Sequence, residues 1–322
     1  MIALIIALGA GIGLDYVLGD PRNRYHPVAW LGRVIGFVIP RLKSSTASVE
    51  KARGALFAIA IVAATGLGTY FLIYAVEYVA GIVALIIASA IVLKLTIAVR
   101  GMERHAQSIM ECVEVGDLEG ARNNLAMIVR RDTSGLSERH ILSATIECIS
   151  ESTVDGITSP VFYFSLFGPA GAVAYRTINT LDSMVGYKDN YFTNIGWMSA
   201  RLDMLANYIP ARLTAFLMVI SARIIGADWT NSLRMLHRDH TKTFSPNAGY
   251  PMATMAGALR IRLEKIGHYS LGDELEPASL EKCRAAIAIM KLTTLLFCAL
   301  VSLPIISILY FAGWWRLLLG VS

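Results

Sequence analysis

Three long stretches with almost no charged residues constrain this fold more than any other feature of the sequence. Residues 54–76 and 292–315 hold no charged side chain, and residues 78–99 hold only Lys94, whose aliphatic stem lets its ammonium reach an interface. A helix of roughly 20 apolar residues crosses a bilayer core, so each run is long enough to span. With 16% charged residues and a mean hydropathy of +0.54, the chain is too apolar for an ordinary soluble domain. We therefore predict an all-α, polytopic helical membrane protein.

The amino-terminal segment is a shorter candidate span. Residues 1–14 are uncharged before Asp15 interrupts the run. At about 1.5 Å per residue, this length falls short of the hydrocarbon thickness. Residues 1–19 therefore cross only if Asp15 lies near an interface. No basic region precedes the apolar run, so we expect no cleaved signal peptide.

Two further apolar stretches are not predicted to be simple spans. Residues 156–175 are uncharged but contain Pro160, Gly168 and Pro169, and residues 213–222 are too short to cross. Broken helices at membrane depth require protein or water around them. We predict re-entrant, interfacial or buried helices for both stretches.

The distribution of basic residues predicts the orientation. If residues 1–19 and the three long runs cross, every lysine and arginine except Arg316 falls on one side, in residues 20–53 and 94–291. The positive-inside tendency assigns that side to the cytoplasm. This topology explains the net charge of +5, and no nucleic-acid motif accompanies it, so no nucleic-acid partner is expected. We predict a multi-pass protein of the cytoplasmic membrane with its catalytic face in the cytoplasm.

The topology divides the chain into three parts. Residues 1–99 form an amino-terminal transmembrane region, residues 100–291 a cytoplasmic and membrane-interfacial catalytic region, and residues 292–322 a carboxyl-terminal anchor. In the catalytic region, Asp117 and Ser137 are predicted N-caps of successive helices.

Three carboxylates recur at every fourth residue of the helix predicted after Ser137. Glu147, Glu151 and Asp155 would lie along one helical stripe, where like charges repel. Magnesium, which takes oxygen ligands, would offset that repulsion. An exposed acidic edge paired with nearby arginines is the alternative, and spacing alone leaves both open.

The segment 130–135, Arg-Arg-Asp-Thr-Ser-Gly, places two guanidinium groups before a loop with hydroxyls. Arginine matches phosphate oxygens bidentately, so this loop is a phosphate-site hypothesis. A plain helix stop would need only its Asp-Thr-Ser-Gly part. It is not a Walker loop, and no glycine-rich nucleotide motif occurs elsewhere.

Other polar positions carry weaker signals. Asn179 and Asp182, three residues apart, can face one way on a helix. Residues 245–249, Ser-Pro-Asn-Ala-Gly, form a turn by composition. His26 lies in a proline-rich loop and could titrate near neutrality.

These motifs, in this order, resemble the adenosylcobinamide-phosphate synthase family of cobalamin biosynthesis. The resemblance covers residues 12–272 and is most specific in the string Asn179–Tyr187. The other matching segments are Leu14-Asp15, Gly19-Asp20-Pro21, His26-Pro27-Val28, Arg131-Asp132-Thr133-Ser134, Asp155-Gly156, Arg201-Leu202-Asp203, Pro210-Ala211-Arg212 and Ser245–Gly249.

The resemblance implies an ATP-dependent, magnesium-using amide ligase of the membrane. Such an enzyme joins an amino-alcohol phosphate, usually (R)-1-aminopropan-2-yl phosphate, to a carboxylate of adenosylcobyric acid, so its substrates include a corrinoid. The lipid bilayer and other enzymes of the corrinoid pathway are further expected partners. The chemistry needs cationic clamps on phosphates and positioning groups more than a protein nucleophile.

The resemblance marks positions, and chemistry laid over them suggests roles. The expected metal ligands are Glu147, Glu151 and Asp155. The expected catalytic groups are Arg131, Asp132, Asp182 and Asp203, and Asp182 is also expected to help hold magnesium. The expected substrate- or phosphate-binding residues are Arg130, Thr133, Asn179, Lys188, Arg201, Arg212, Ser245, Asn247, Asp15, Asp20 and His26.

Three positions depart from the family pattern. Ser152 stands where an asparagine is expected, Met204 where an aspartate is expected, and Met252 where a glutamate is expected. Two other functions therefore stay open. A membrane transferase acting on a diphosphate lipid would use carboxylates four residues apart beside a bilayer, and a non-catalytic sensor or assembly protein would tolerate the two methionines.

Overall fold

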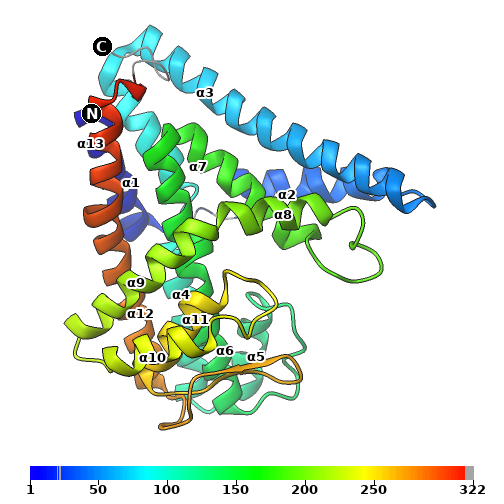
Figure 1. Ribbon diagram of the computed structural model, residues 1–322, viewed down its shortest axis with the longest axis vertical. Coiled ribbons are helices and arrows are strands. Elements are labelled where there is room, and N and C mark those ends of the chain that lie inside the picture. Colours follow the sequence, from blue (N-terminus) through cyan, green and yellow to red (C-terminus); the bar gives the residue numbers. More distant parts are fainter. Residues whose placement is uncertain (20, 22, 316–322) are drawn as a thin grey trace. The chain divides into compact units, whose positions relative to one another are not determined.

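The computed structural model describes residues 1–19, 21 and 23–315, and these fold almost entirely into helices. The prediction of an all-α, polytopic membrane fold is confirmed, with one short β-hairpin added in the described part (Figure 1). The α-helices are α1 (Ile2–Leu18), α2 (Pro27–Val38), α3 (Ala47–Lys94), α4 (Val99–Glu114), α5 (Leu118–Ala126), α6 (Glu138–Thr153), α7 (Ser159–Val185), α8 (Trp197–Ala206), α9 (Tyr208–Ile224), α10 (Trp229–Asp239), α11 (Gly249–Leu259), α12 (Leu280–Phe297) and α13 (Leu303–Phe311). Short 3-10 turns are η1 (Asn23–Tyr25) and η2 (Ile39–Leu42), π turns are η3 (Val154–Thr158) and η4 (Cys298–Ser302), and the strands are β1 (Leu263–Lys265) and β2 (Tyr269–Leu271).

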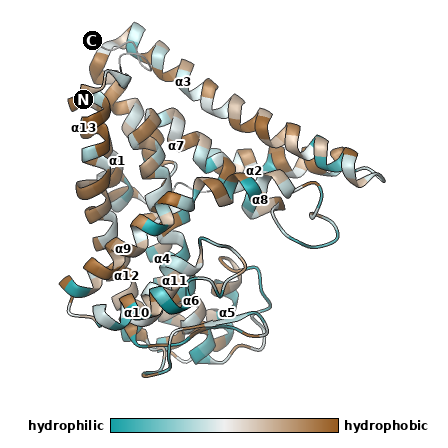
Figure 2. Cartoon of the chain, viewed as in Figure 1, coloured by the Kyte–Doolittle hydropathy of each residue, from teal (hydrophilic) through white to brown (hydrophobic). Residues whose placement is uncertain are grey.

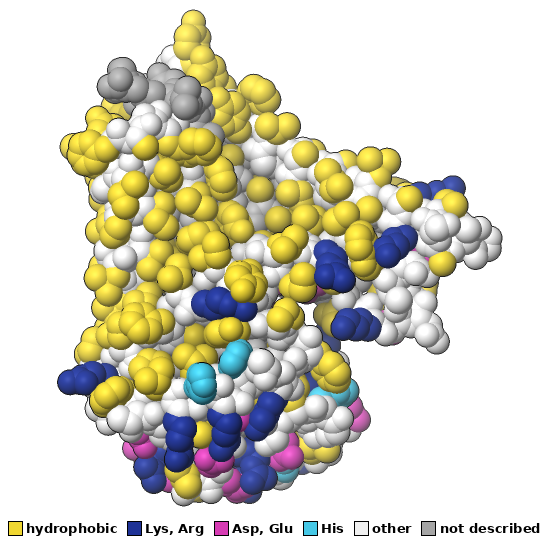
Figure 3. Space-filling model, viewed as in Figure 1, with side chains coloured by type: hydrophobic (Ala, Val, Ile, Leu, Met, Phe, Trp, Pro, Cys, Tyr) yellow, Lys and Arg dark blue, Asp and Glu magenta, His cyan; other side chains and the backbone are white. Residues whose placement is uncertain are grey.

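Several described helices are long and apolar enough to cross a membrane. Ala47–Glu114, Glu138–Val185 and Leu280–Phe311 pass by length and composition, and a fourth passes if α8 and α9 count as one broken span. Helix α1 is apolar but shorter. Figure 2 shows that hydrophobic residues predominate along α1, α3 and α13, and Figure 3 shows many hydrophobic side chains on the surface of this part of unit 1. Many are exposed on α3, as expected of a lipid-facing helix (Leu56, Ile59, Leu67, Phe71, Leu72, Val79, Val83, Ile87).

Two glycines turn long helices back on themselves. Gly81 (φ 76°, ψ −173°) interrupts α3, and Gly168 (φ 65°, ψ −156°) interrupts α7 just before Pro169. Only glycine adopts these backbone angles readily. The rings of Tyr163 and Tyr175 stack with centroids 5.3 Å apart, whereas residues at that separation on a straight helix would be about 18 Å apart. The predicted break within residues 156–175 is therefore confirmed, and the chain turns between the first and second arms of α3 at Gly81.

The described chain forms two compact units. Unit 1 contains Met1–Ala98, Ser159–Asn207 and Cys298–Ser322, the last described to Trp315, and unit 2 contains Val99–Thr158 and Tyr208–Phe297. Residues 159–207, placed with the catalytic region in the sequence analysis, thus pack with the apolar segments of unit 1. The three-part division concerns membrane crossing and stays a prediction.

A buried cluster in unit 1 fixes the carboxyl end of α7. Leu181 and Val185, four residues apart on one face of α7, pack against Ile35 of α2, Ala58 of α3 and Ile195. All five side chains are nearly inaccessible to solvent. The motif Asn179–Tyr187 is therefore carried on a helix end that several elements hold in place.

Unit 2 is a helical body, and its helices α5 and α6 begin after the predicted N-cap residues Asp117 and Ser137. Asp117 caps α5 by accepting a hydrogen bond from Gly120 N at 2.8 Å, as predicted. Ser137 occupies the N-cap position of α6 but makes no capping bond, because its hydroxyl is bonded to His140 Nδ1 at 2.7 Å. The hairpin β1–β2 pairs Leu263 with Leu271 and packs on α6 and α11.

An ion cluster at the end of α10 ties the hairpin to the helices of unit 2. The buried carboxylate of Asp239 accepts hydrogen bonds from Arg238 Nε at 2.7 Å and from Gly272 N at 2.7 Å, and it pairs with Lys242 at 2.6 Å. Burial alone would raise the pKa of Asp239, but these donors outweigh it and hold that pKa well below its usual range. The segment that leaves β2 is therefore anchored by an ionised carboxylate.

Candidate active site

The predicted site residues fall in both units, and in unit 2 the structure brings Arg131 and Glu147 together. Arg131 lies in the loop after α5, and its Nη2 is 3.4 Å from Glu147 Oε2 on α6. Tyr269 of β2 donates its hydroxyl to the other oxygen, Glu147 Oε1, at 2.8 Å. The side chains of Glu147 and Arg131 are 8% and 15% exposed, so this is a largely buried ion pair. Glu147 therefore holds both the guanidinium and the hairpin in place.

Burial and the neighbouring carboxylate act on Tyr269 in the same direction. Burial first, then the charge of Glu147 and the hydrogen bond to it, raise the pKa of Tyr269 above its usual value. The phenol therefore stays protonated as a donor at physiological pH.

The three carboxylates of the predicted magnesium stripe have different surroundings in the structure. Glu147 is engaged by Arg131 and Tyr269, Glu151 is exposed, and Asp155 lies in the π turn η3 after α6 has ended. A π turn inserts an extra residue, which rotates the following side chain out of the four-residue register. Among the described residues no group of three or more histidine, cysteine or acidic side chains could hold a metal ion. Magnesium bound with substrate phosphates stays a prediction.

A polar cavity of about 220 Å³ opens beside Arg131, and we call it the hairpin pocket. Its charged and titratable lining comes from three places: the loop after α5, the first turn of α6 and the β1–β2 hairpin. The lining side chains with ionisable groups are Arg131, Asp132, His140, Glu264, Lys265 and His268, and two aliphatic residues complete the wall. The pocket thus contains both signs of charge in a small volume.

The remaining residues of the 130–135 loop have distinct positions. Asp132 accepts hydrogen bonds from Ser134 N at 2.9 Å and from Ser134 Oγ at 2.7 Å, and these bonds lower the pKa of Asp132. Thr133 is buried, and its hydroxyl donates to the carbonyl of Arg122 at 3.1 Å. Thr133 therefore anchors the loop to α5, although the sequence analysis placed it on a phosphate. Arg130 is exposed and does not line the hairpin pocket.

Two other predicted site residues, Arg212 and Asn247, also meet in unit 2. Arg212 of α9 donates from Nη1 to Asn247 Oδ1 at 3.3 Å and to the carbonyl of Tyr208. Its guanidinium carbon lies 3.5 Å from the ring centroid of Tyr208 and 4.3 Å from that of Tyr250. Cation–π contacts of this kind hold a guanidinium in place while its N–H groups remain directed along its plane.

In unit 1 the family-like string forms the end of α7. Asn179 is buried and accepts a hydrogen bond from Arg176 Nη1 at 3.2 Å. Asp182 is half-buried one turn further on, and Tyr187 donates to the carbonyl of Ser183 at 2.8 Å. The predicted shared face of Asn179 and Asp182 thus includes a cation, Arg176, on the preceding turn.

Asp203 belongs to a buried polar network in unit 1. Asn207 Nδ2 donates to Asp203 Oδ2 at 3.1 Å, while Asn207 Oδ1 accepts from Ser159 Oγ at 2.6 Å and from the hydroxyl of Tyr175 at 2.8 Å. The network joins α8 to both arms of the broken helix α7. Asp203, expected to be catalytic, is therefore placed where it also stabilises that break.

Four other predicted residues lie apart from these groups, Ser245 is bonded to Asn247, and Asp20 is outside the described residues. Lys188 and Arg201 are exposed and make no hydrogen bond or ion pair with the residues described. Ser245 Oγ accepts from Asn247 N at 3.3 Å within its turn, and His26 Nδ1 caps α2 by accepting from Val28 N at 3.2 Å. Asp15 is fully buried in α1. Asp20 lies outside the described residues.

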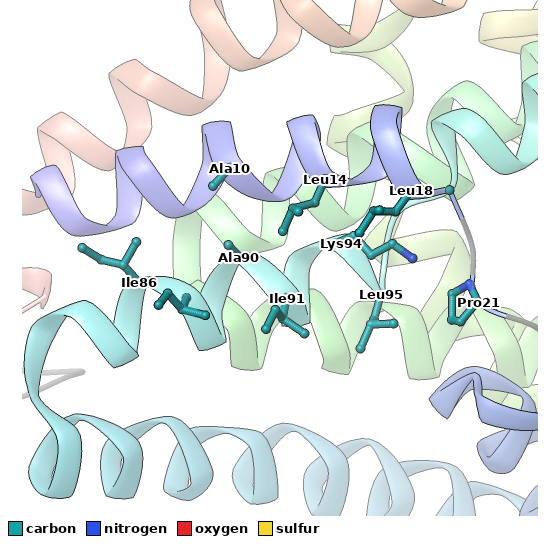
Figure 4. Close-up of a pocket in the computed structure, with 11 residues that line it drawn as sticks. Ala10, Leu14, Leu18, Pro21, Ile86, Ala90, Ile91, Lys94 and Leu95 are labelled. Carbon is teal, nitrogen blue, oxygen red and sulfur yellow. The ribbon is translucent and has the colours of Figure 1, made fainter.

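A larger cavity of about 650 Å³ lies in unit 1 between α1 and the second arm of α3. Its lining is aliphatic except for Lys94, whose side chain extends past Leu18 toward Pro21 (Figure 4). Substrate sites need several placed polar groups to orient a ligand. This cavity contains none of the predicted catalytic residues, so we place the candidate active site elsewhere.

Comparison with known proteins gives the family. A model described as "CobD/Cbib protein" matches residues 8–297. The chain belongs to the CobD/Cbib family. A "probable cobalamin biosynthesis protein CobD" of Methanothermobacter thermautotrophicus is 41% identical over 289 residues, covering 88% of this chain and 92% of the relative. A "cobalamin biosynthesis protein CobD" of Pelobacter propionicus is 37% identical over 310 residues, covering 94% and 95%. No solved structure matches this chain.

For this CobD/Cbib family member, the structure adds residues that sequence reasoning did not select. Lys265, His140 and His268 line the hairpin pocket, and Tyr269 holds Glu147. The only local signal was Gly267, which indicates a turn but not what lies opposite it.

One departure from the family pattern lies beside this group. Met252 is buried, with its sulfur 3.9 Å from the hydroxyl of Tyr269. A carboxylate at that position would sit next to the phenol that donates to Glu147, so the methionine keeps this side of Tyr269 apolar. Met204 and Ser152 are half-buried, and nothing in the structure explains their departure from the pattern.

Proposed function

We propose that this chain is an ATP-dependent amide ligase of cobalamin biosynthesis. It joins an amino-alcohol phosphate, (R)-1-aminopropan-2-yl phosphate in the first instance, to a carboxylate of adenosylcobyric acid. Family membership supports the pathway, since the relatives are named cobalamin biosynthesis proteins. The observation that carries the ligase reading is the hairpin pocket, where Arg131 is held against Glu147 beside Lys265.

The reaction needs activation because a carboxylate does not react with an amine unaided. The carboxylate oxygen attacks the terminal phosphorus of ATP, and ADP leaves. The amine nitrogen then attacks the acyl carbon, phosphate leaves, and the amine loses a proton. Each step redistributes negative charge over phosphoryl oxygens, so positioned cations lower its barrier.

The side chains of unit 2 fit this demand. Glu147 and Tyr269 fix the guanidinium of Arg131, so little conformational freedom is lost when an anion binds to it. Arg212, held by two aromatic rings and Asn247, is a second oriented guanidinium. Arginine in a fixed plane recognises phosphate oxygens through two parallel hydrogen bonds.

The described side chains do not form a protein-only magnesium cage. Magnesium would arrive on the phosphates of ATP, which commonly supply several of its ligands. We also place the catalytic face in the cytoplasm, because the basic residues gather outside the apolar runs.

A direct assay tests the ligase. Detergent-purified protein receives adenosylcobyric acid, aminopropanol phosphate, ATP and magnesium, with each omitted in turn, and mass spectrometry detects the amide. We expect product only in the complete mixture and a loss of at least about 100-fold in rate for Arg131→Met, because one buried charge-assisted contact is worth that much in a transition state. Arg284→Met, which removes an exposed surface pair with Glu114, is the matched control and should stay near wild type. An intact preparation that forms no amide, even with ethanolamine phosphate, would reject the ligase.

A further inference from the structure

The hairpin pocket carries an inference about which substrate it binds. Its size is the first constraint. A volume of about 220 Å³ is smaller than the roughly 300–1,000 Å³ of cavities that enclose drug-sized ligands. A corrinoid or a whole nucleotide therefore exceeds it, whereas a small phosphate monoester does not.

Its charges are the second constraint. Two basic residues, Arg131 and Lys265, line the same cavity as two acidic residues, Asp132 and Glu264. Arg131 is also partly neutralised by Glu147. A polyanion such as the triphosphate of ATP would meet these carboxylates at a cost. A small molecule with a phosphate at one end and an ammonium at the other would satisfy both signs.

The hydrogen bonds that each side chain already makes show which of them are available to a ligand. Asp132 is already engaged by Ser134 through one oxygen. The side chains of Glu264 and Lys265 make no hydrogen bond or ion pair within the described part of the chain. Arg131 Nε is buried and donates to no described acceptor.

The hairpin is held firmly enough to present these groups. Tyr269 follows the turn and is bonded to Glu147, while Gly272 beyond β2 is bonded to Asp239. The turn itself closes through His268 N to the carbonyl of Lys265 at 2.9 Å. Glu264 and Lys265, neighbours on β1 that both line the pocket, therefore lie on a short hairpin anchored to two helices.

We propose that the hairpin pocket binds a small aminoalkyl phosphate as a zwitterion, with the phosphate on Arg131 and Lys265 and the ammonium on Glu264. This rests on the proposed ligase function and assigns the amino-alcohol phosphate, rather than ATP or the corrinoid, to this pocket. His140 and His268 line the same cavity and supply further hydrogen-bonding nitrogens.

The test matches each substituted side chain to the ligand group that it is proposed to bind. Binding is measured by calorimetry on the purified full chain in detergent, with three probes: (R)-1-aminopropan-2-yl phosphate, propan-2-yl phosphate without the amine, and ATP. Lys265→Met should weaken both monoesters at least about tenfold, the scale of one charge-assisted hydrogen bond. Glu264→Gln should weaken only the amine-bearing monoester, by about tenfold, and leave propan-2-yl phosphate unchanged.

Matched controls guard against a general loss of charge or fold. Arg262→Met removes a cation beside the same strand but outside the pocket, and it should leave all three affinities within about twofold. Lys265→Arg retains the charge and should recover most of the monoester binding, which a misfolded hairpin would not.

Three outcomes would overturn the assignment: Lys265→Met behaving like Arg262→Met, Glu264→Gln weakening both monoesters equally, or Lys265→Met weakening ATP while sparing the monoesters. The amide assay separates this idea from the ligase. The predicted binding pattern without amide product would retain the pocket and reject the ligase. Amide product without the predicted binding pattern would retain the ligase and reject the pocket assignment.

Discussion

Replacing Tyr269 by phenylalanine removes a single hydroxyl from the centre of the candidate site. That hydroxyl donates to Glu147 Oε1 at 2.8 Å, while the nearest donor to the other oxygen, Arg131 Nη2, is 3.4 Å away. Phenylalanine preserves the ring and leaves one oxygen of a buried carboxylate without its donor. The substitution therefore tests whether this bond holds the hairpin to α6.

The expected cost follows from the charge and burial of the pair. A hydrogen bond to a charged group contributes about 1.5–3 kcal/mol, and the phenol is only half-buried, so we expect about 2 kcal/mol. That is about a 30-fold larger equilibrium constant for local opening of the hairpin. Hydrogen exchange of the amides in β1 and β2 should accelerate by the same factor, because these amides exchange when the hairpin separates from α6.

The matched control is Tyr163→Phe, which removes a neutral bond to the carbonyl of Ala206 in unit 1. Its hairpin amides should exchange at the wild-type rate. If Tyr269→Phe also left hairpin exchange unchanged, the Tyr269–Glu147 bond would not be the anchor described above.

The same residue predicts a pH effect. The folded-state pKa of Tyr269 is raised, whereas an unfolded tyrosine titrates near pH 10. The stabilisation from the neutral phenol is therefore fully present below about pH 10 and is lost as the pH rises further. Tyr269→Phe should flatten this alkaline loss, as measured by unfolding midpoints between neutral and alkaline pH.

Three further predictions concern other parts of the chain. Asp239→Asn should cost about 2 kcal/mol at pH 7, and because its folded pKa is depressed the difference should shrink as the pH falls below about 4, which thermal unfolding at both pH values would reveal. Arg212→Met should reduce the rate of amide formation at least about tenfold. The control Arg223→Met removes a guanidinium that stacks on Trp229 from the same helix, and it should not reduce the rate. Equal rates for the two variants would show that Arg212 is not part of the site. Gly168→Ala should destabilise the protein by about 2 kcal/mol because φ 65°, ψ −156° is a glycine-only conformation, and Gly135→Ala, with open space around it, should lower the unfolding midpoint far less.

The helical and membrane character of the chain was predictable because it depends on local composition. A bilayer requires long apolar helices whatever their neighbours, so the uncharged runs 54–76 and 292–315 were sufficient evidence. The N-cap at Asp117 was also predictable, because its capping bond joins residues only three apart. The break in residues 156–175 followed from glycine and proline, whose backbone restrictions act at their own positions.

The candidate site was only partly predictable. Arg131, Glu147, Arg212 and Asn247 were selected by residue type and motif, but the contact between Arg212 and Asn247 was not predicted. Spacing left two alternatives for Glu147, a magnesium stripe or a pairing with nearby arginines; the structure pairs it with Arg131 and adds Tyr269, a partner that spacing did not indicate. A stripe follows from helix geometry alone, but the partner of a buried carboxylate depends on which distant groups the fold brings within hydrogen-bonding range.

By itself, the sequence determined an all-α membrane fold, the cap at Asp117, the break in residues 156–175, and a set of polar positions that resemble one family. These properties depend on contacts within a helical turn or on the solvent that a run of residues requires. The tertiary structure alone decided that the hairpin 263–271 closes a pocket over Arg131 and that residues 159–207 pack with the apolar helices. The groups in that pocket are far apart along the chain, and only the packing of unit 2 places their charges around one small volume.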